Sequence, residues 1–471
     1  MGLRPLLLLP EILLFVGGLT SLVAGSFVAR QRQWLTRVVA AVALLGSIVA
    51  AGIDLTRPAQ TAFGGSFGVD TGSGIARILA AIATLLVLAL ATDEIAASPR
   101  ESETYALLLF STTGALVLAG ANDLLVLAVG FLLTSIPLYG LVGLAHTTKS
   151  AEAAMKTYLL GALFGILLLL GITILYGLAG TTAYVDLSGR LGGAPATATA
   201  AGLVAVLAGL MFKAGGVPAH FWVPDAAQGS SGTVATFLTT VPKIGAIVAA
   251  YRLVTALPDN IGWPLLVAIL AGASMTLGNL AAYWQQDARR LLGWSTISQV
   301  GFLLVPVSVA GHSEMALPSL LYYLAGYTVT NIAAFAVTTA LPDHRDLGSY
   351  RGLASSHPWL AGSLVVALLG LVGTPPTAVF IGKLTTATAA WDGGQAWLAV
   401  VVFVNSLASL FYYLRWIIPS YRIGERDSSA PRRFAPAPWS TRIAVTASMS
   451  TILLGVAAGA VWTVVDGMLA R

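Results

Sequence analysis

Residues 209–230 read GLMFKAGGVPAHFWVPDAAQGS and interrupt a long apolar run with a lysine, glycines and prolines. Pro218 removes a helical hydrogen bond, and Gly215 and Gly216 allow the backbone to leave the helix. Within a bilayer, such a break persists only where it faces protein or a water-filled cavity. The stretch therefore predicts a membrane helix that is broken just after Lys213, beside a polar interior.

The composition extends this prediction to the whole chain. Of 471 residues, 57% are hydrophobic and 10% are charged, whereas roughly 25% are charged in an ordinary soluble domain. Apolar runs recur along the sequence, each close to the roughly 20 residues that cross the hydrocarbon core. The runs are unbroken rather than alternating, so they predict helices rather than barrel strands. We therefore expect an all-α polytopic membrane protein.

The pattern predicts about fourteen transmembrane helices. They cover residues 8–27, 36–53, 75–92, 105–120, 123–144, 154–178, 199–217, 235–255, 263–283, 289–309, 315–340, 358–384, 395–417 and 442–465.

The distribution of lysine and arginine predicts the orientation of these helices, because cytoplasmic loops carry an excess of both. One side of the membrane has the loops that follow the odd-numbered helices. The basic residues on this side are Arg30, Arg32, Arg37, Arg100, Lys149, Arg289, Arg290, Arg345, Arg351, Arg415, Arg422, Arg426, Arg432, Arg433 and Arg442. The opposite side holds Arg4, Arg57, Arg77, Arg190, Arg252 and Arg471. We expect a multi-pass protein of a bacterial plasma membrane, with both termini outside the cytoplasm.

A second break, GTPPTAVFIGK at residues 373–383, falls in the twelfth expected helix. Broken helices at corresponding places in two halves are typical of transporters built from internal repeats. We expect a three-helix segment first, then two five-helix halves, and last a polar cytoplasmic linker with the final helix. The linker is expected to be solvated, the alternative being an arm that lies on the membrane or on a neighbour. The four units cover residues 1–104, 105–255, 256–417 and 418–471.

Lysines within expected helices are the main functional signal. Lys213 and Lys383 lie at the two breaks, and Lys243 follows Pro242 inside the eighth helix. A charge at mid-membrane costs roughly 2.5–3.5 kcal/mol on insertion scales, and such residues usually mark ion pathways. Lysine can gain and lose a proton as its surroundings change, whereas arginine stays charged. The pattern favours proton relay; the alternative is that these lysines reach an interface or fix helix packing.

Three further residues are candidates for the same path. Glu152 and Lys156 are four residues apart in the favourable order for a helical ion pair. His220, two residues after Pro218, titrates near neutral pH and could relay protons. It could equally be an interfacial histidine beside Phe221.

The sequence argues against several other kinds of chemistry. It contains no cysteine and only five scattered histidines, so neither an iron–sulfur cluster nor a metal site is expected in this chain. There is no phosphate-binding glycine loop and no nucleophile elbow. The basic residues follow one membrane face, so nucleic acid is not an expected partner.

The sequence resembles the antiporter-like proton-channel subunits of complex I, and most closely subunit N of bacterial NADH-quinone oxidoreductase. The block at residues 209–230, linked to the block at 373–383, is the most specific signature. Other matching segments are LLPEILL (8–14), TYALLLFSTTGALVLAGANDLLVLAVG (104–130), SAEAAMKTYLLGALFGILLLLG (150–171), TTVPKIGA (239–246), LGNLAAYWQQDARRLLGWSTISQVGFLL (277–304), YYLAGYTVTNIAAFAV (322–337) and DLGSYRGL (346–353).

The resemblance implies two inverted five-helix repeats around a hydrated path, with discontinuous helices seven and twelve. It implies that the family's proton-path lysines correspond to Lys213, Lys243 and Lys383, and its sixth-helix pair to Glu152 and Lys156. It also implies that NADH, FMN, iron–sulfur clusters and quinone belong to partner subunits. The expected partners are the other membrane subunits, the lipid bilayer and protons.

One position departs from the family pattern. The family usually carries a fifth-helix glutamate that pairs with the seventh-helix lysine, and the matching segment here, GFLLTSIP at residues 130–137, has Leu132 in its place. We hypothesise that Glu152 replaces it as the partner of Lys213. Three alternatives remain open: a subunit of a multisubunit cation/proton antiporter, a subunit of a membrane-bound hydrogenase, and a structural paralogue that does not pump.

Overall fold

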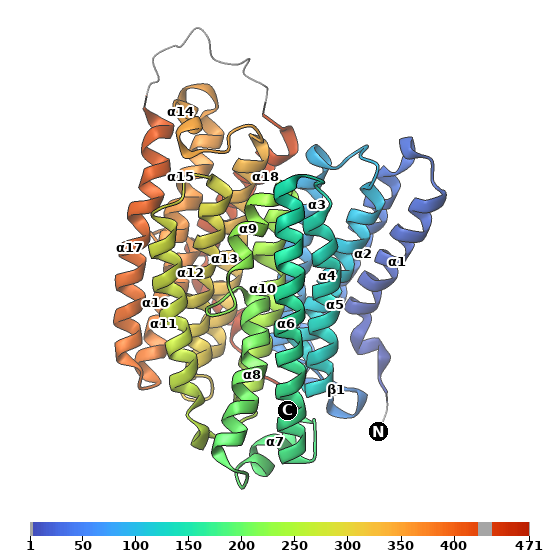
Figure 1. Ribbon diagram of the computed structural model, residues 1–471, viewed down its shortest axis with the longest axis vertical. Helices are drawn as coiled ribbons and strands as arrows, with labels where there is room; N and C mark the ends of the chain where they lie inside the picture. Colours follow the sequence, from blue (N-terminus) through green and yellow to red (C-terminus); the bar gives the residue numbers. More distant parts are fainter. Residues whose placement is uncertain (1–2, 423–435, 471) are drawn as a thin grey trace.

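The computed structural model describes residues 3–422 and 436–470, and nearly all of them lie in one helical bundle (Figure 1). Most of the polar stretch 418–441, expected to be a solvated linker, lies outside the described residues, whereas residues 418–421 and 438–441 are helical. The long helices are α1 (Leu9–Phe27), α2 (Trp34–Leu55), α3 (Thr71–Glu94), α4 (Glu101–Gly120), α5 (Leu124–Gly143), α6 (Thr148–Ala179), α8 (Ala196–Ala214), α10 (Gly232–Thr255), α11 (Trp263–Ala282), α12 (Ala288–Ser308), α13 (Ala316–Ala340) and α17 (Ala396–Tyr421).

Shorter elements complete the described chain. They are the helices α7 (Tyr184–Leu191), α9 (Trp222–Gly229), α14 (Leu353–Ser356), α15 (Pro358–Val372), α16 (Ala378–Asp392), α18 (Pro438–Val456) and α19 (Ala458–Val465), with an antiparallel hairpin of β1 (Gln60–Ala62) and β2 (Phe67–Val69). Neither the hairpin nor α7 was predicted from the sequence. Each is too short and too polar to stand out from the loops between apolar runs.

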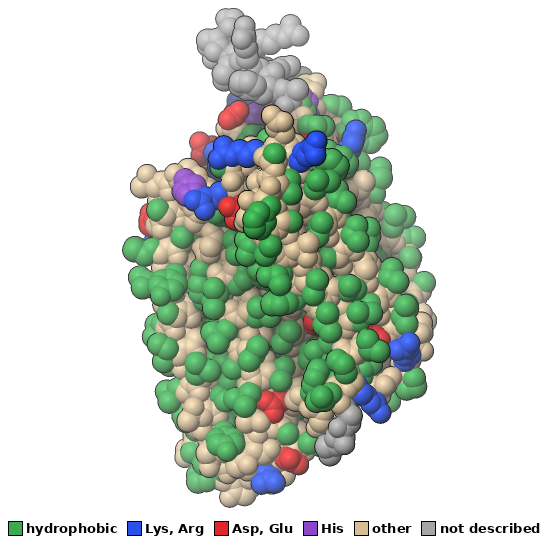
Figure 2. Space-filling view, turned by 90° about the vertical axis from the view of Figure 1, so that its right-hand side faces the viewer, with side chains coloured by type: hydrophobic (Ala, Val, Ile, Leu, Met, Phe, Trp, Pro, Cys, Tyr) green, Lys and Arg blue, Asp and Glu red, His purple; other side chains and the backbone are tan. Residues whose placement is uncertain are grey.

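The predicted fold class is confirmed. In the described part of the chain, twelve helices are long and apolar enough to cross a membrane, and the bent pair α18–α19 would make a thirteenth. The remaining expected span, 358–384, is divided between α15 and α16. Figure 2 shows hydrophobic side chains over the middle of the molecule, with lysine and arginine mostly towards its two ends.

The last expected span, 442–465, is wrong as a single straight helix. The chain bends by 82° between α18 and α19. Beyond this bend Ala470 is held at both backbone groups: its N–H donates to Asp70 at 2.7 Å, and its carbonyl accepts from Asn122 at 3.0 Å. Both partners of Ala470 lie at the end of the bundle that carries the N- and C-termini (the lower end of Figure 1), which we call the terminal face. These distant contacts hold the chain that follows the bend against the terminal face.

The opposite end is called the upper face here; it is where α3 ends and α10 begins. Two adjacent carboxylates of α3 fix other helices there. Glu94 accepts from the Gly232 and Thr233 N–H groups at 2.9 and 2.8 Å, and Asp93 accepts from the Ser440 N–H at 2.6 Å. A helix N-terminus leaves N–H groups free and carries partial positive charge, so each carboxylate stabilises the start of its helix. They anchor α10 and α18 to the first three helices.

The interior of the bundle is formed by α10, α12 and α13, which are buried over almost their whole length. Figure 1 shows α10 at the centre, where it packs against α8 and α13. The outer helices α1, α2, α6 and α17 expose many large apolar side chains, as expected for surfaces that face lipid or neighbouring subunits. The interior helices carry the conspicuous polar residues of the sequence, and they position the candidate site.

Candidate functional site

The first helix break lies at the end of α8, and its last turn carries Lys213, which is fully buried. Gly215 ends the helix at a φ of +83°, and a Cβ at this position would lie 2.7 Å from Val223. Glycine is needed here because L side chains rarely adopt this conformation. The chain turns back so that Trp222 of α9 donates its indole hydrogen to the Phe212 carbonyl at 2.9 Å. The break thus holds α9 against the lysine-bearing end of α8.

Lys243 lies in the middle of α10 and is also fully buried. Its Nζ is 4.7 Å from the centroid of the Trp222 ring, and the Nζ of Lys213 is 5.1 Å from the centroid of the Phe131 ring. Neither Nζ has a hydrogen-bond partner among the described residues. A buried ammonium without a partner is unfavourable, so each lysine needs water or must lose its proton. These are the properties of groups that exchange protons.

The second break separates α15 from α16, where Gly373 adopts a φ of +90°. Lys383 of α16 donates to the carbonyls of Leu371 and Val372 at 3.0 and 2.9 Å, and its Nζ lies 3.9 Å from the centroid of the Phe302 ring. The carbonyls in the last turn of a helix have no partner within that helix. The break therefore provides acceptors for a buried lysine at mid-bundle.

Polar side chains of α12 and α13 lie between the two breaks. Tyr327 donates to the Thr239 carbonyl of α10 at 2.6 Å. Tyr323 donates to Gln299 at 2.6 Å, and the amide of Gln299 donates to the Leu371 carbonyl at 2.9 Å, the same carbonyl that accepts from the second-break lysine. Hydroxyl and amide groups in series can order water and pass protons along it. These buried hydrogen bonds connect α13 to α10 and to α12, and α12 to the end of α15.

Glu152 and Lys156 form the predicted ion pair on α6, at 2.6 Å, but they lie at the surface. Lys156 also reaches Asp225 of α9 at 2.8 Å, and Asp225 pairs with Arg290 of α12. Burial alone would raise the pKa of Asp225, but its hydrogen bonds from these two cations hold the pKa below its usual range. Asp225 of α9 therefore links α6 to α12.

Asp225 and Arg290 were missed by the sequence analysis. Asp225 lies in the quoted block at residues 209–230, but nothing in the local sequence indicates which cations it meets, because Lys156 and Arg290 are far away along the chain. Only the packing of α6, α9 and α12 brings the three residues together.

We expect Asp225→Asn to destabilise the protein by about 1–3 kcal/mol, because a half-buried carboxylate would lose two charged partners and leave them unpaired. Glu152→Gln is the matched control: it removes one exposed ion-pair partner, so a change of no more than about 0.5 kcal/mol is expected. Thermal unfolding of the detergent-solubilised chain measures both. Equal melting temperatures for the two variants would contradict the linking role of Asp225.

The hypothesis that Glu152 replaces the missing fifth-helix glutamate is wrong. Glu152 pairs with Lys156, and Lys213 has no carboxylate partner among the described residues. The reason lies in the register of α5: Phe131 is buried against Lys213, whereas Leu132 is 43% exposed and points away from the interior. The residue of α5 beside Lys213 is therefore an aromatic one, not a carboxylate.

His220 lies between α8 and α9 and is 3% exposed. Its ring centroid is 4.2 Å from that of Phe221 and 5.6 Å from that of Trp294, and its Nδ1 has no hydrogen-bond partner among the described residues. The histidine is therefore part of the first break but does not contact any of the three buried lysines through a hydrogen bond or ion pair. Its role in proton transfer stays a prediction.

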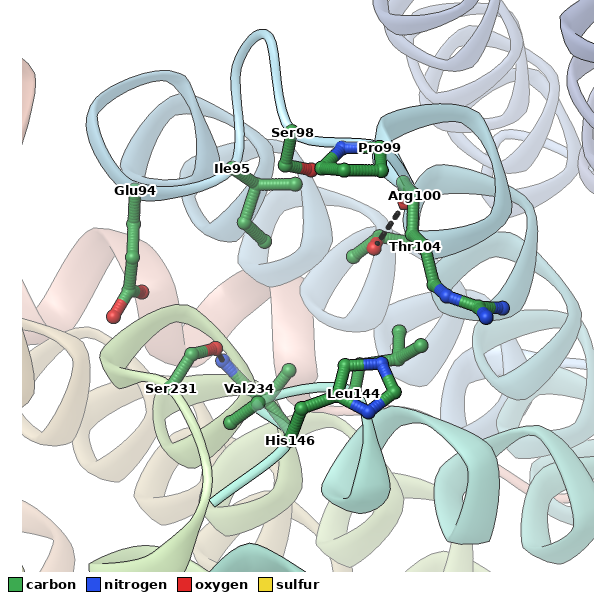
Figure 3. A pocket seen from close by; sticks show the side chains of 11 residues that line it. Glu94, Ile95, Ser98, Pro99, Arg100, Thr104, Leu144, His146, Ser231 and Val234 are labelled. Atoms are coloured by element: carbon green, nitrogen blue, oxygen red, sulfur yellow. Dashed lines mark hydrogen bonds between the residues drawn. The ribbon is translucent and has the colours of Figure 1, made fainter.

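A pocket of about 230 Å³ opens at the upper face, between the ends of α3 and α5 and the starts of α4 and α10 (Figure 3). Figure 3 shows Glu94 on one side of the pocket and Arg100 on the other, with His146 below. None of the three buried lysines lines it. Glu94, the carboxylate of this pocket, already accepts hydrogen bonds from the first N–H groups of α10. The pocket is therefore separate from the lysine site. Within residues 3–422 and 436–470, no group of three or more histidines and carboxylates could hold a metal ion.

A family model described as NADH:quinone oxidoreductase/Mrp antiporter, TM, matches residues 121–409. NADH-quinone oxidoreductase subunit N of Mycobacterium sp. (strain JLS) is 66% identical over 98% of this chain and 99% of its own length. The chain belongs to the subunit N family of NADH-quinone oxidoreductase. A further subunit N relative, from Streptomyces griseus, is 51% identical over 97% of both chains. The resemblance identified from the sequence is confirmed.

Solved structures agree with membership of the subunit N family. A chain of respiratory complex I from Thermus thermophilus with bound aureothin superposes with a TM-score of 0.83 at 29% identity, covering 98% of this chain and 100% of that one. A chain of the Mrp complex from Dietzia sp. DQ12-45-1b gives a TM-score of 0.84 at 22% identity, covering 98% and 95%. At that identity the second match concerns the fold alone. The fold is thus shared with a chain of complex I and a chain of the Mrp complex, whereas the sequence relatives show the subunit N family.

Proposed function

We propose that this chain translocates protons across the membrane as subunit N of an NADH-quinone oxidoreductase, driven by redox chemistry in partner subunits. The observation that carries the proposal is the set of three buried lysines, two of them at helix breaks, with buried polar side chains of α12 and α13 between the two breaks. Lysine suits this role because it can take up and release a proton, and the unpartnered state of Lys213 and Lys243 gives each a reason to do so.

The arrangement of the halves supports a path with two ends. We propose that residues 105–255 and 256–417 are inverted repeats, each with one broken helix. On α10, four hydroxyl groups lie between Lys243 and the upper face, at Thr233, Thr236, Thr239 and Thr240, whereas the seven residues 244–250 that follow Lys243 are apolar. Lys243 is therefore suited to receive protons from the upper face, which the arginine distribution assigns to the cytoplasm.

The same proposal assigns partners and location. The other membrane subunits of the complex would cover part of the exposed apolar surface, and lipid the rest. NADH, FMN, iron–sulfur clusters and quinone would be bound elsewhere in the complex. Both termini would lie outside the cytoplasm of a bacterial plasma membrane.

The direct test is Lys243→Met in the intact complex. We expect proton uptake into inverted membrane vesicles, measured per NADH oxidised, to fall, because the relay loses the titrating group at its centre. NADH oxidation with an artificial electron acceptor should stay normal, which would show that the complex assembles. Unchanged proton uptake would exclude Lys243 from the path.

A second function, that of a subunit which supports the complex without pumping, is favoured by one specific feature. Phe131, rather than a carboxylate, faces Lys213, so this lysine lacks the charged partner that the family resemblance implies. Lys213→Met discriminates the two: an active relay would lose proton uptake, whereas a structural subunit would keep it.

A further inference from the structure

The pocket at the upper face combines hydrogen-bond donors with an apolar wall (Figure 3). The donors are the guanidinium of Arg100, the ring of His146 and the hydroxyl groups of Ser98 and Ser231. Among the described residues, no hydrogen bond or ion pair engages the side chain of Arg100 or the ring of His146. The guanidinium N–H groups therefore remain free beside a cavity of about 230 Å³.

The carboxylate of Glu94 does not neutralise this charge. It accepts from the N–H groups of Gly232 and Thr233 at 2.9 and 2.8 Å. The buried cation of Arg289 lies beside the same helix start, since a Cβ on Gly232 would be 2.9 Å from its Nη2. Figure 3 shows Arg100 on the opposite side of the pocket from Glu94, and no ion pair joins the two in the described part of the chain. The pocket therefore offers an unpaired positive charge to a ligand.

The two loops that carry Arg100 and His146 are held in shape without a ligand. In the first loop, buried Glu101 accepts from the Ala97 N–H at 2.7 Å and from the Tyr105 hydroxyl at 2.9 Å. Ala97 has a φ of +63° and His146 a φ of +49°. Non-glycine residues with positive φ are uncommon, and they persist where the surrounding structure holds them, often at ligand sites. The donors are therefore preorganised, which lowers the entropic cost of binding.

The chemistry of the lining indicates an anion with an apolar part. A guanidinium binds two phosphate oxygens through parallel N–H groups, and the hydroxyl and ring N–H groups add neutral donors. The apolar wall of the same pocket comes from Ile95, Leu144 and Val234. A free phosphate is hydrated on all sides and would leave this wall unused. The glycerol and first methylene groups of a phospholipid would cover it.

The position of the pocket also suits a lipid. It lies where α3 and α5 end and α4 and α10 begin, which is the depth at which lipid headgroups meet the ends of spanning helices. On the outer side of α5, Val129, Leu132 and Ile136 are exposed at spacings of about one helical turn. Gly140 is exposed one turn further towards the upper face. An exposed apolar strip therefore leads along α5 towards the pocket.

We propose that this pocket binds the phosphate of an anionic phospholipid, with Arg100 and His146 as its main contacts and the apolar wall against the glycerol backbone. An anionic lipid is preferred over a zwitterionic one, because a choline group would add a second cation beside Arg100. None of the three buried lysines lines the pocket. The proposal therefore goes beyond proton translocation and does not depend on it.

The test is phospholipid binding to the full chain in a mild detergent, counted one lipid at a time by native mass spectrometry. Phosphatidylglycerol is the anionic probe, and phosphatidylcholine with the same acyl chains is the zwitterionic one. Arg100→Gln removes the charge at the pocket, whereas Ser98→Phe fills the pocket and keeps the charge. Arg190→Gln is the matched control, because Arg190 is likewise exposed but lies in α7, at the opposite end of the bundle (Figure 1).

We expect the first phosphatidylglycerol to bind at least about fivefold more weakly to Arg100→Gln, the factor that one basic residue contributes near an anionic lipid. Ser98→Phe should weaken it to a similar extent. Arg190→Gln should change it by less than about twofold, because a distant surface charge is screened. The melting temperature of Arg100→Gln should equal that of the unsubstituted chain, since the side chain has no partner to lose. If it melts lower, Ser98→Phe decides.

Four results would overturn the site. Equal effects of Arg100→Gln and Arg190→Gln would reduce it to general surface charge, and equal affinities for the two lipids would remove its selectivity for anions. Displacement of phosphatidylglycerol by inorganic phosphate alone would assign the pocket to free phosphate. If Arg100→Gln kept its lipid affinity but no longer comigrated with the other subunits on a native gel, the pocket would bind a partner protein instead. None of these measurements uses proton uptake, so the site can fail while the proposed function stands.

Discussion

Lys383→Arg should stop proton translocation through this subunit although it preserves the positive charge. From ordinary pKa values, the deprotonated fraction of arginine at neutral pH is at least about 100-fold smaller than that of lysine. A relay that requires the group to release its proton cannot operate with arginine. A structural role, in which the cation only binds the Leu371 and Val372 carbonyls, would be preserved by arginine. Proton uptake per NADH in inverted vesicles is the measurement.

The comparison with Lys383→Met makes the result interpretable. Methionine removes both the charge and the proton, so both variants should fail if the lysine is a relay. Recovery of pumping by arginine but not by methionine would contradict the relay and favour static binding to the second break. Comigration of the variant chain with the other subunits on a native gel shows whether the substituted complex has assembled.

Arg77→Met should destabilise the protein by about 3–5 kcal/mol, the range for breaking a buried ion pair by removing one partner. Arg77 of α3 is fully buried and bonds to both oxygens of Glu11 at 2.8 and 2.9 Å, to Asp54 at 3.2 Å and to the Leu7 carbonyl at 3.0 Å. These contacts join α1, α2 and α3 near the terminal face. Methionine would leave the buried carboxylate of Glu11 and the partly buried one of Asp54 without their shared cation.

Arg77→Lys is the informative control for this prediction. Lysine keeps the charge but cannot bind both oxygens of Glu11 in the planar geometry of arginine. We therefore expect an intermediate loss of stability, measured as a smaller drop in melting temperature of the solubilised chain than with methionine. If Arg77→Met melted at the temperature of the unsubstituted chain, the cluster would contribute nothing to the packing of the first three helices.

The sequence indicated most of the fold because membrane helices obey a local rule. Without water, a segment must satisfy its own backbone hydrogen bonds, so any apolar run of sufficient length forms a helix whatever surrounds it. The same rule explains why Lys213 and Lys383 could be assigned to helix breaks: glycine and proline act on the backbone of their own segment. It fails for the last helix, where distant hydrogen bonds of Ala470 with Asp70 and Asn122 hold the chain that follows the bend.

Partners of side chains could not be predicted in the same way. The Glu152–Lys156 pair was found because both residues share one helix face, but Asp225 and Arg290 complete that cluster from other helices. The residue facing Lys213 was missed for the same reason. A shift of one position along α5 is a rotation of about 100°, and this separates buried Phe131 from exposed Leu132.

The sequence by itself thus determined the all-α membrane fold, the two helix breaks and the buried lysines, since each follows from local backbone chemistry and from the solvent around it. Only the tertiary structure decided which groups those lysines meet: aromatic rings beside Lys213 and Lys243, and freed carbonyls beside Lys383. The physical reason is that burial energy depends on composition along one segment, whereas hydrogen bonds and ion pairs depend on how helices far apart in the chain are rotated against one another.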